Sequence, residues 1–345
     1  MSTVSIAPLA ESLPAFLDSN DFSDIAVIAD NHTSRFCYPE LKSFLPKHTL
    51  IRLKSGEEQK HIATCELIWD ALTRANFDRH ALVLNLGGGV IGDMGGFCAA
   101  TYKRGIAFAQ LPTTLLSQVD ASVGGKLGID FRGFKNHIGV FKQPEAVLID
   151  TTFLATLPER ELRSGFAEVI KHCLIADATM WDEIRRRDLE EQDWSTLVAH
   201  SVAVKQRIVE QDPTEKGLRK ILNFGHTLGH AVETYFLTQP RKRLLHGEAI
   251  AVGMIAEAYI AVHKKMIDEI VLTQIEEYIF AVYGNVRLLD GDIEPILSLT
   301  LQDKKNRGHQ VRMALLDGPG SCAFDIPVTA SEMRRGLEFY RGLNK

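Results

Sequence analysis

The stretch "NFGHTLGH" at residues 223–230 places His226 and His230 four residues apart, with glycines at 225 and 229. In a helix, this spacing puts both imidazoles on one face. Zinc proteases with the motif H-E-x-x-H share the spacing, but Thr227 stands where those enzymes have their catalytic glutamate. The stretch therefore indicates a candidate metal site whose chemistry is not proteolysis.

Two further residues could complete such a site. His246 begins the next predicted helix in "HGEAIAVGM", and Glu168 lies in the amphipathic segment "SGFAEVIKH". One carboxylate and two histidines form a three-ligand zinc site that keeps one position open for substrate. Spacing alone does not choose among the rivals, which are His172, His226, His230, His246 and, as a second carboxylate, Glu248.

A glycine-rich segment, "GGGVIGDMGGF" at residues 87–97, satisfies G-x-G-x-x-G directly after a predicted strand and before a predicted helix. Backbone N–H groups and a helix N-terminus in this context favour a bound phosphate, so the segment predicts a dinucleotide loop. An acid that would hold the ribose is expected about twenty residues later, but "FAQLPTT" contains none. The remaining candidates for the adenosine side are Asp30, Glu57 and Lys60.

A basic segment follows at residues 120–141, "DASVGGKLGIDFRGFKNHIGVF". We expect it to be a loop that wraps a small polyanion, because ammonium, guanidinium and amide groups stand among glycines. The basic and polar residues concerned are Lys126, Arg132, Lys135, Asn136 and His137.

The elements that must position these residues differ between the two halves of the chain. Short apolar runs at 24–29, 81–86, 106–111 and 146–150 predict buried strands, which alternate with a helical stripe at 58–77. This alternation is typical of an α/β domain with a parallel sheet. Helical patterns then follow at 159–175, 195–211, 218–236, 247–266 and 269–283, with a late hairpin around "DGPGS" and a last helix from Ser331. We therefore expect an α/β domain over residues 1–155 and a mostly helical domain over 156–345.

Bulk composition excludes several classes. The chain of 345 residues carries a net charge of −5, which gives no general attraction to nucleic acid. Five scattered cysteines without a C-x-x-C pair favour a reducing cytosol over a disulfide framework. The N-terminus lacks the pattern of a signal peptide, and the apolar runs are too short to span a bilayer. We expect a cytoplasmic protein without a membrane partner.

Taken together, the motifs resemble one family, 3-dehydroquinate synthase of the sugar-phosphate cyclase superfamily. The resembling stretches, in family order over most of residues 80–260, are "GGGVIGDMGGFCAATYKRGI", "LPTTLLSQVDASVGGKLGID", "KNHIGVFKQP", "SGFAEVIKH", "GLRKILNFGHTLGHAVE" and "HGEAIAVGM". The resemblance implies an N-terminal α/β domain that binds NAD, a helical C-terminal domain, a site in the cleft between them, and a homodimer.

Matching residue by residue, the resemblance implies zinc or cobalt ligands at Glu168, His226 and His246. His230 then contacts the substrate instead of the metal. The implied NAD contacts are Asp30, Glu57, Lys60, Gly88, Gly89, Asp93, Thr113 and Thr114. The implied catalytic residues are Lys126, Asn136, Lys171, His230 and Asp120, and the implied substrate contacts are Arg104, Lys205, Arg219, Asn223 and Lys304. Arg104 would reach the site of the partner subunit.

The family reaction is a step of the shikimate pathway towards aromatic amino acids. It converts 3-deoxy-D-arabino-heptulosonate 7-phosphate to 3-dehydroquinate by transient oxidation with NAD, phosphate elimination, reduction, ring opening and aldol closure. Two alternatives share the motif types: a sister cyclase that makes 2-deoxy-scyllo-inosose or a valiolone, and a metal-dependent alcohol dehydrogenase of the glycerol dehydrogenase type. The joint presence of Lys205, Arg219, Asn223 and His230 favours the carboxylated heptulosonate. A third alternative, an NAD-binding regulatory protein with an inactive site, is disfavoured because every catalytic position is retained.

Overall fold

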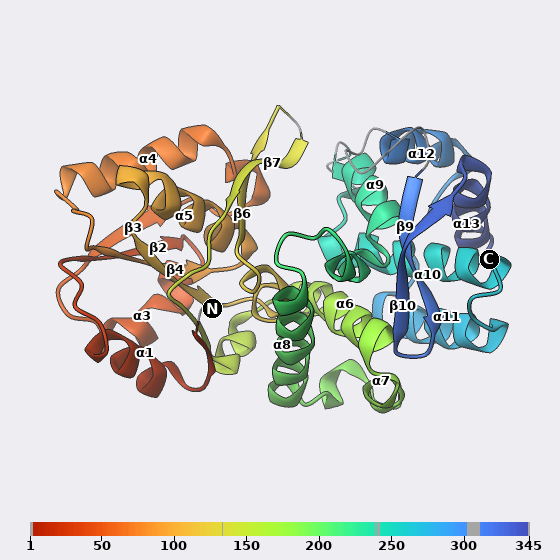
Figure 1. Cartoon of the computed structure of the whole chain (residues 1–345), viewed down its shortest axis with the longest axis horizontal. Coiled ribbons are helices and arrows are strands. Elements are labelled where there is room, and N and C mark those ends of the chain that lie inside the picture. The colour runs from red at the N-terminus through yellow and green to blue at the C-terminus, as the bar shows by residue number, and fades with distance from the viewer. Residues whose placement is uncertain (1–2, 133, 238, 240–241, 302–310, 344–345) are drawn as a thin grey trace. The chain divides into compact units, whose positions relative to one another are not determined.

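A computed structural model describes residues 3–132, 134–237, 239, 242–301 and 311–343 of the chain. It divides into two compact units (Figure 1). The first contains Met1–Leu162 and Trp194–Val202, and the second contains Arg163–Asp193 and Ala203–Lys345. The expected domain boundary at residues 155 and 156 stays a prediction.

The first unit is built on a six-stranded parallel sheet with the order β1-β8-β5-β4-β2-β3. The strands are β1 (Thr3–Ile6), β2 (Ile25–Asp30), β3 (Thr49–Leu53), β4 (Leu82–Gly87), β5 (Ala107–Pro112) and β8 (Ala146–Ile149). The prediction of a parallel sheet is confirmed. The two edge strands, β1 and β3, are missing from the sequence-based prediction because they are short and partly exposed, so they lack a continuous apolar run.

Helices cover both faces of this sheet (Figure 1). Cores lie on both sides because successive strand residues point to opposite faces: Val83 of β4 packs beneath α4 and α5, whereas Leu82 and Leu84 pack beneath α1 and α3. The helices are α1 (Leu9–Asp18), α2 (Thr33–Phe36), α3 (Tyr38–Lys42), α4 (Ile62–Arg74) and α5 (Gly89–Thr101). The unit is therefore a doubly wound α/β fold.

The direction of winding reverses between β2 and β4. From β2 the chain continues outward to β3, whereas from β4 it continues through β5 towards β8 on the other side. Ligands of open α/β sheets bind beyond the carboxyl ends of strands at such a reversal. Here the carboxyl ends of β2 and β4 carry Asp30 and Gly87, respectively. The sheet therefore brings two predicted cofactor segments to the carboxyl ends of neighbouring strands.

The segment expected to be a basic loop is instead an antiparallel hairpin of β6 (Lys126–Phe131) and β7 (Phe134–Phe141). The expectation was wrong because β7 is exposed along most of its length and has no buried alternate residues that would mark it as a strand. Gly128 pairs with Gly139, and a Cβ on Gly128 would lie 3.1 Å from the carbonyl oxygen of Ile138. The glycines therefore serve close strand pairing and not loop flexibility.

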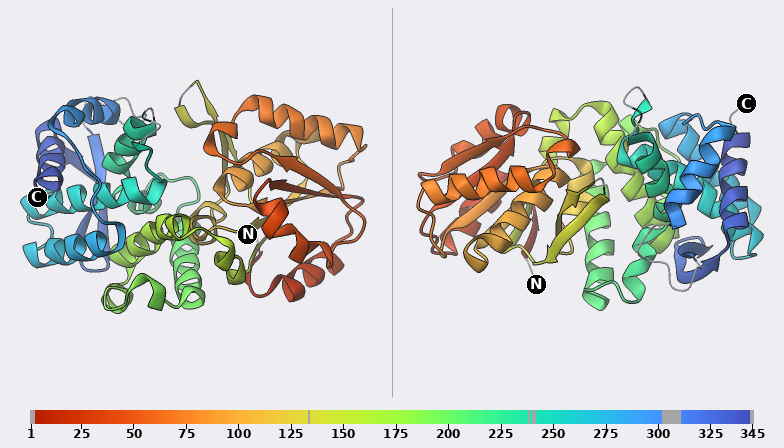
Figure 2. Two further views of the ribbon diagram at one scale, coloured as in Figure 1. Left: turned by 180° about the vertical axis from the view of Figure 1, so that it is seen from behind. Right: turned by 90° about the horizontal axis from the view of Figure 1, so that it is seen from above.

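The second unit is mostly helical and contains an antiparallel hairpin, as predicted (Figure 2). Its central helix α10 packs against α9, α11, α13 and β9, and it is buried around most of its circumference because it is apolar on nearly all sides. Two helices, α6 (Glu159–Ala176) and α8 (Trp194–Gln211), begin in the first unit and end in the second. The other helices and strands of the second unit are α7 (Ala178–Ile184), α9 (His226–Leu237), α10 (His246–His263), α11 (Glu269–Tyr283), α12 (Ile293–Leu301), β9 (Val311–Gly318), β10 (Ser321–Val328) and α13 (Ala330–Gly342).

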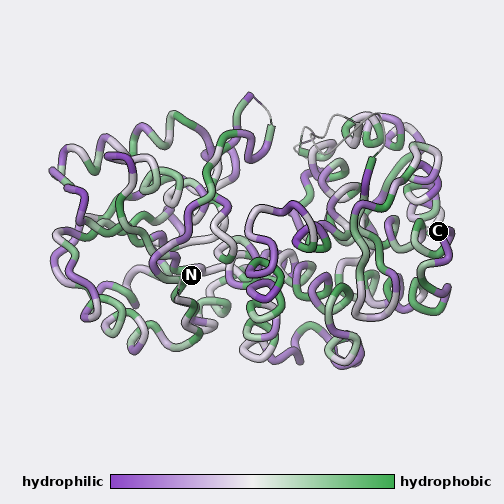
Figure 3. Tube along the Cα trace, in the orientation of Figure 1, coloured by the Kyte–Doolittle hydropathy of each residue, from purple (hydrophilic) through white to green (hydrophobic). Residues whose placement is uncertain are grey.

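Outside α10, most helices alternate between hydrophobic and hydrophilic residues along their length, as expected for helices with one packed face (Figure 3). Across the described residues, the structure contains no helix with the length and apolarity needed to cross a membrane. All five cysteines are free thiols, and four of them are buried.

Candidate functional site

The helix predicted over residues 218–236 is interrupted just before His226. A 3₁₀ helix, η6 (Leu218–Asn223), ends at Asn223, and Gly225 has a φ of +78°, outside the helical range. The prediction of one continuous helix was wrong because the apolar pattern does not report this change of direction. His226 is consequently the first residue of α9, and His230 lies one turn later with its ring centroid 5.0 Å away.

Glycines bring α9 and α10 into backbone contact near this start. A Cβ on Gly253 of α10 would overlap the carbonyl oxygen of Gly225, and a Cβ on Gly229 would lie 3.1 Å from Ala249 O. The glycines of "NFGHTLGH" therefore serve helix packing. His226 and His246, at the starts of these two helices, are held at a set separation by that contact.

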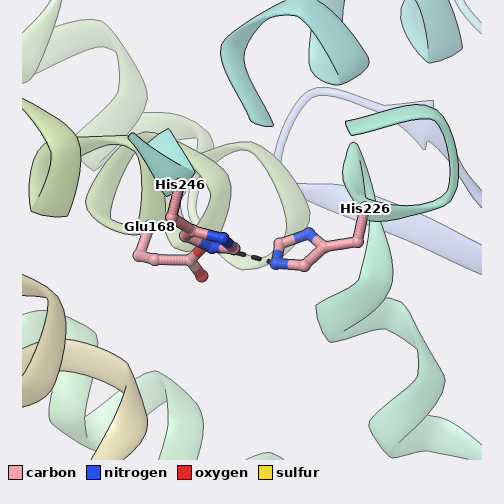
Figure 4. A group of neighbouring side chains, drawn as sticks. All are labelled: Glu168, His226 and His246. Atoms are coloured by element: carbon pink, nitrogen blue, oxygen red, sulfur yellow. Dashed lines mark hydrogen bonds and ion pairs between the residues drawn. The ribbon is translucent and has the colours of Figure 1, made fainter. Parts of the chain in front are cut away.

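Glu168, His226 and His246 come together from α6, α9 and α10 (Figure 4). Glu168 Oε1 lies 3.3 Å from His226 Nε2 and 3.2 Å from His246 Nε2. A tetrahedral zinc ion with ligand bonds of about 2.0–2.1 Å needs ligand atoms roughly 3.3 Å apart. The donor set and its spacing thus fit zinc without rearrangement of these two pairs.

The second ring nitrogen of each histidine is also occupied. His226 Nδ1 lies 3.0 Å from the carbonyl oxygen of Phe224, and His246 Nδ1 lies 3.5 Å from Glu233 Oε2. Both partners accept hydrogen bonds, so each Nδ1 would carry the proton when the Nε2 atoms, which face Glu168, bind a metal ion. Outer partners of this kind orient metal-binding imidazoles. Glu233 was not predicted, although its position three residues after His230 on α9 was a usable signal.

Burial and neighbouring charges change the pKa values of Glu168, His226 and His246. Burial alone would raise the pKa of Glu168, but the Lys171 ammonium and the His226 ring hold that pKa well below its usual range. Burial lowers the pKa of His226, and the neighbouring Glu168 carboxylate opposes this shift. For His246, burial acts in the same direction, but hydrogen bonds to Glu168 and Glu233 raise its pKa to about 10. A metal ion must therefore displace a proton from His246.

The competing ligands from the sequence are Glu248, His230 and His172. Glu248 accepts a hydrogen bond from the Leu245 N–H at 2.8 Å and so caps α10. His230, Glu233 and His246 form a second group within metal-binding distance. We favour the group around Glu168, since Glu233 faces Nδ1 of His246 and His230 is exposed. His172 is fully buried in α6.

The remaining substrate candidates of the second unit include two buried cations. Lys205 on α8 is 5% exposed, and Arg219 in η6 is 2% exposed, with its Nη1 donating to Pro213 O at 2.8 Å. Asn223 Nδ2 donates to Glu215 Oε1 at 2.6 Å. Lys171 pairs with Glu168 in the interior. The predicted contact Lys304 lies outside the described residues.

In the first unit, the glycine loop forms the start of α5, with Gly88 at the N-cap and Gly89 as the first helical residue. The Thr113 N–H donates to Gly87 O at 3.1 Å, and a Cβ on Gly88 would lie 3.0 Å from Thr114 Cγ2. The loop and the two threonines therefore surround one helix N-terminus, which favours a phosphate.

Three predicted residues of the first unit form one hydrogen-bonded cluster. The buried Lys60 donates from Nζ to Asp93 Oδ2 and to Asn136 Oδ1, both at 2.6 Å. Asn136 has a φ of +48° in β7. The structure thus joins two predicted cofactor contacts to a predicted catalytic residue, a connection that the sequence did not indicate.

The other candidates of the first unit occupy separate elements. Lys126 is exposed at the start of β6, Arg104 is exposed after α5, and Asp120 is half-buried in a π-helical turn at Ser117–Ala121. Glu57 forms an ion pair with Lys135, with Oε1 3.5 Å from Nζ. Asp30 Oδ1 accepts from the backbone N–H groups of His32 and Thr33, both at 2.8 Å.

Comparison with known families gives matches to both halves of the chain. The family model described as "3-dehydroquinate synthase N-terminal" matches residues 50–164, and the one described as "3-dehydroquinate synthase C-terminal" matches residues 165–306. A 3-dehydroquinate synthase of Parabacteroides distasonis is 38% identical over 96% of each chain. One from Halorhodospira halophila is 43% identical over 87% of this chain and 86% of its own.

Among solved structures, 2-epi-5-epi-valiolone synthase from Streptomyces hygroscopicus, with NAD⁺ and Zn²⁺ bound, resembles this chain with a TM-score of 0.89. The two sequences are 28% identical, and the match covers 99% of this chain and 97% of the other.

Proposed function

The chain belongs to the 3-dehydroquinate synthase family, and from this premise we propose that it converts 3-deoxy-D-arabino-heptulosonate 7-phosphate to 3-dehydroquinate and phosphate. The observation that carries the proposal is the match of both family halves along residues 50–306, with relatives of the same name over most of the chain.

NAD and a zinc or cobalt ion are the cofactors; when bound, they would supply a reversible oxidation at one substrate hydroxyl carbon, with the metal polarising the hydroxyl oxygen. Glu168, His226 and His246 would hold the ion. Gly88, Gly89 and Thr113 would surround the dinucleotide phosphates at the N-terminus of α5, where backbone N–H groups point outward.

The chain's own cations are suited to the two ends of the substrate. Lys126 and Asn136 on the hairpin, with Arg104, would bind the phosphate and stabilise it as a leaving group. The buried Lys205 and Arg219 would take the carboxylate, because a guanidinium matches a carboxylate in bidentate fashion and a buried cation is stabilised by an anion. His230, Asp120 and Lys171 would hold or move protons at the reacting carbons.

The direct test follows phosphate, NADH and carbocyclic product together during turnover of the heptulosonate phosphate. We expect phosphate and product in equal amounts and no accumulation of NADH, since the oxidised cofactor is regenerated in each cycle. Glucose 6-phosphate and sedoheptulose 7-phosphate serve as controls that lack the carboxylate. Efficient cyclisation of either, with little activity on the heptulosonate, would indicate a sister cyclase; stoichiometric NADH would indicate an alcohol dehydrogenase.

The proposal extends to a homodimer in the cytoplasm in which Arg104 completes the partner's phosphate site. Closed symmetric dimers are the commonest oligomers, and Arg104 is exposed. We expect an inactive Arg104→Ala chain mixed with an inactive Lys126→Ala chain to recover roughly a quarter of wild-type activity, because half of the dimers would be mixed and each would contain one intact site. Mixed dimers that form but stay inactive would rule out a shared site.

A further inference from the structure

Glu257 is a carboxylate in the interior of α10 with no role in the chemistry described above. Its side chain is 0% exposed. Oε2 accepts the Gly225 N–H at 2.7 Å, and Oε1 accepts the Leu228 N–H at 2.9 Å. A carboxyl group this deeply buried is costly unless it is well satisfied, so its position calls for a specific partner.

These two bonds cap α9. In a capping box, the N-cap side chain accepts the N3 N–H, and the N3 side chain accepts the N-cap N–H. Gly225 occupies the N-cap position and Leu228 the N3 position of α9, and neither has a side chain that can cap. Glu257 makes both bonds from the neighbouring helix.

The start of α9 cannot cap itself with an ordinary N-cap residue. Gly225 has a φ of +78°, and a Cβ there would lie 2.6 Å from Met254 Cγ. Serine, threonine or aspartate would be strained and would collide with α10. The close contact that sets the separation of α9 and α10 therefore requires a cap supplied by α10.

The hydrogen bond from the Gly225 N–H to Glu257 is connected to the proposed metal ligand His226 through one peptide group. The N–H of the Phe224–Gly225 peptide donates to Glu257 Oε2, and the C=O of that peptide lies 3.0 Å from His226 Nδ1. Hydrogen bonds in series polarise one another. The carboxylate makes Phe224 O a better acceptor for Nδ1–H, which favours the tautomer whose Nε2 lone pair is available to a metal ion.

We propose that Glu257 is a positioning residue for the metal: it caps α9 and, through the Phe224–Gly225 peptide, sets the orientation and tautomer of His226. The inference rests on the proposed metal site and deepens it. Glu257 itself contacts neither metal nor substrate in this role, so its replacement changes the metal environment through His226.

The test is Co²⁺ titration of metal-stripped protein, with the visible absorption of the bound ion as a readout independent of activity. Glu257→Gln keeps the volume but presents an amide NH₂ to one of the two N–H donors. We expect it to weaken Co²⁺ binding by roughly 10–100-fold, as loss of outer partners does elsewhere, and to change the absorption spectrum. Glu257→Asp keeps both acceptor oxygens on a shorter side chain, so its Co²⁺ affinity should lie between that of the wild type and that of Glu257→Gln. It replaces the glutamine variant in the test if that variant does not fold.

Glu332→Gln is the matched control, because Glu332 forms the capping box of α13 with Thr329. It should lower the melting temperature and leave the Co²⁺ affinity and spectrum unchanged. Unchanged Co²⁺ binding in folded Glu257→Gln and Glu257→Asp, or an equal loss in Glu332→Gln, would overturn the inference and leave the proposed metal site standing. Failure of the wild type to bind Co²⁺ would overturn both.

Discussion

His226→Ala is expected to lose the metal and roughly a thousandfold of its turnover, whereas His230→Ala keeps the metal. Polarisation of a substrate oxygen by a bound metal contributes several kcal/mol, which corresponds to this loss. His226 Nε2 lies 3.3 Å from Glu168 Oε1 and belongs to the proposed ligand group, but His230 is exposed one turn later. Metal content by elemental analysis and steady-state rates of the same preparations measure the two effects.

His246→Ala provides the second arm of this experiment and should behave like His226→Ala. His230→Ala should still lose activity, because we place that residue at the substrate, and added Zn²⁺ should not restore it. Loss of the metal in His230→Ala, with retention in His226→Ala, would assign the site to the second group of His230, Glu233 and His246.

Lys171→Met is expected to destabilise the metal-free protein by up to about 3–5 kcal/mol, because it removes one cationic partner of the buried Glu168 carboxylate and leaves only the two histidines to compensate its charge. Glu168 is 0% exposed and Lys171 is 1% exposed, and they form an ion pair. In the metal-loaded protein, the ion itself compensates the Glu168 charge, so the loss should be smaller. Urea unfolding with and without saturating Zn²⁺ gives both free energies of unfolding.

Lys264→Met is the corresponding surface control. Lys264 pairs with Glu332 at 2.7 Å, and both side chains are about a fifth exposed. A pair of this kind contributes about 0–1 kcal/mol, and Zn²⁺ should have no effect on the difference. An equal destabilisation of Lys171→Met in both metal states would show that the ion does not share the role of counter-charge to Glu168.

Much of the fold follows from local patterns. The buried runs around Val27, Val83 and Ala109 are apolar on both faces of the sheet, and such runs are typical of interior parallel strands. The glycine loop was recognisable because it stands between one such strand and a helix. The short edge strands and the β6–β7 hairpin were not predictable in the same way, because exposed strands carry little hydrophobic periodicity.

The sequence by itself determined the fold class and the family, and it predicted the dinucleotide loop and the candidate ligands, since short motifs carry these signals. Only the tertiary structure decided how those residues meet. It placed His226 at a helix start, aimed two Nε2 atoms at Glu168, and brought in Glu233 and Glu257. Helical periodicity reports which face a residue occupies, but the partner across that face is supplied by another helix. Buried donors and acceptors must be satisfied there, and that requirement acts only once the helices have packed.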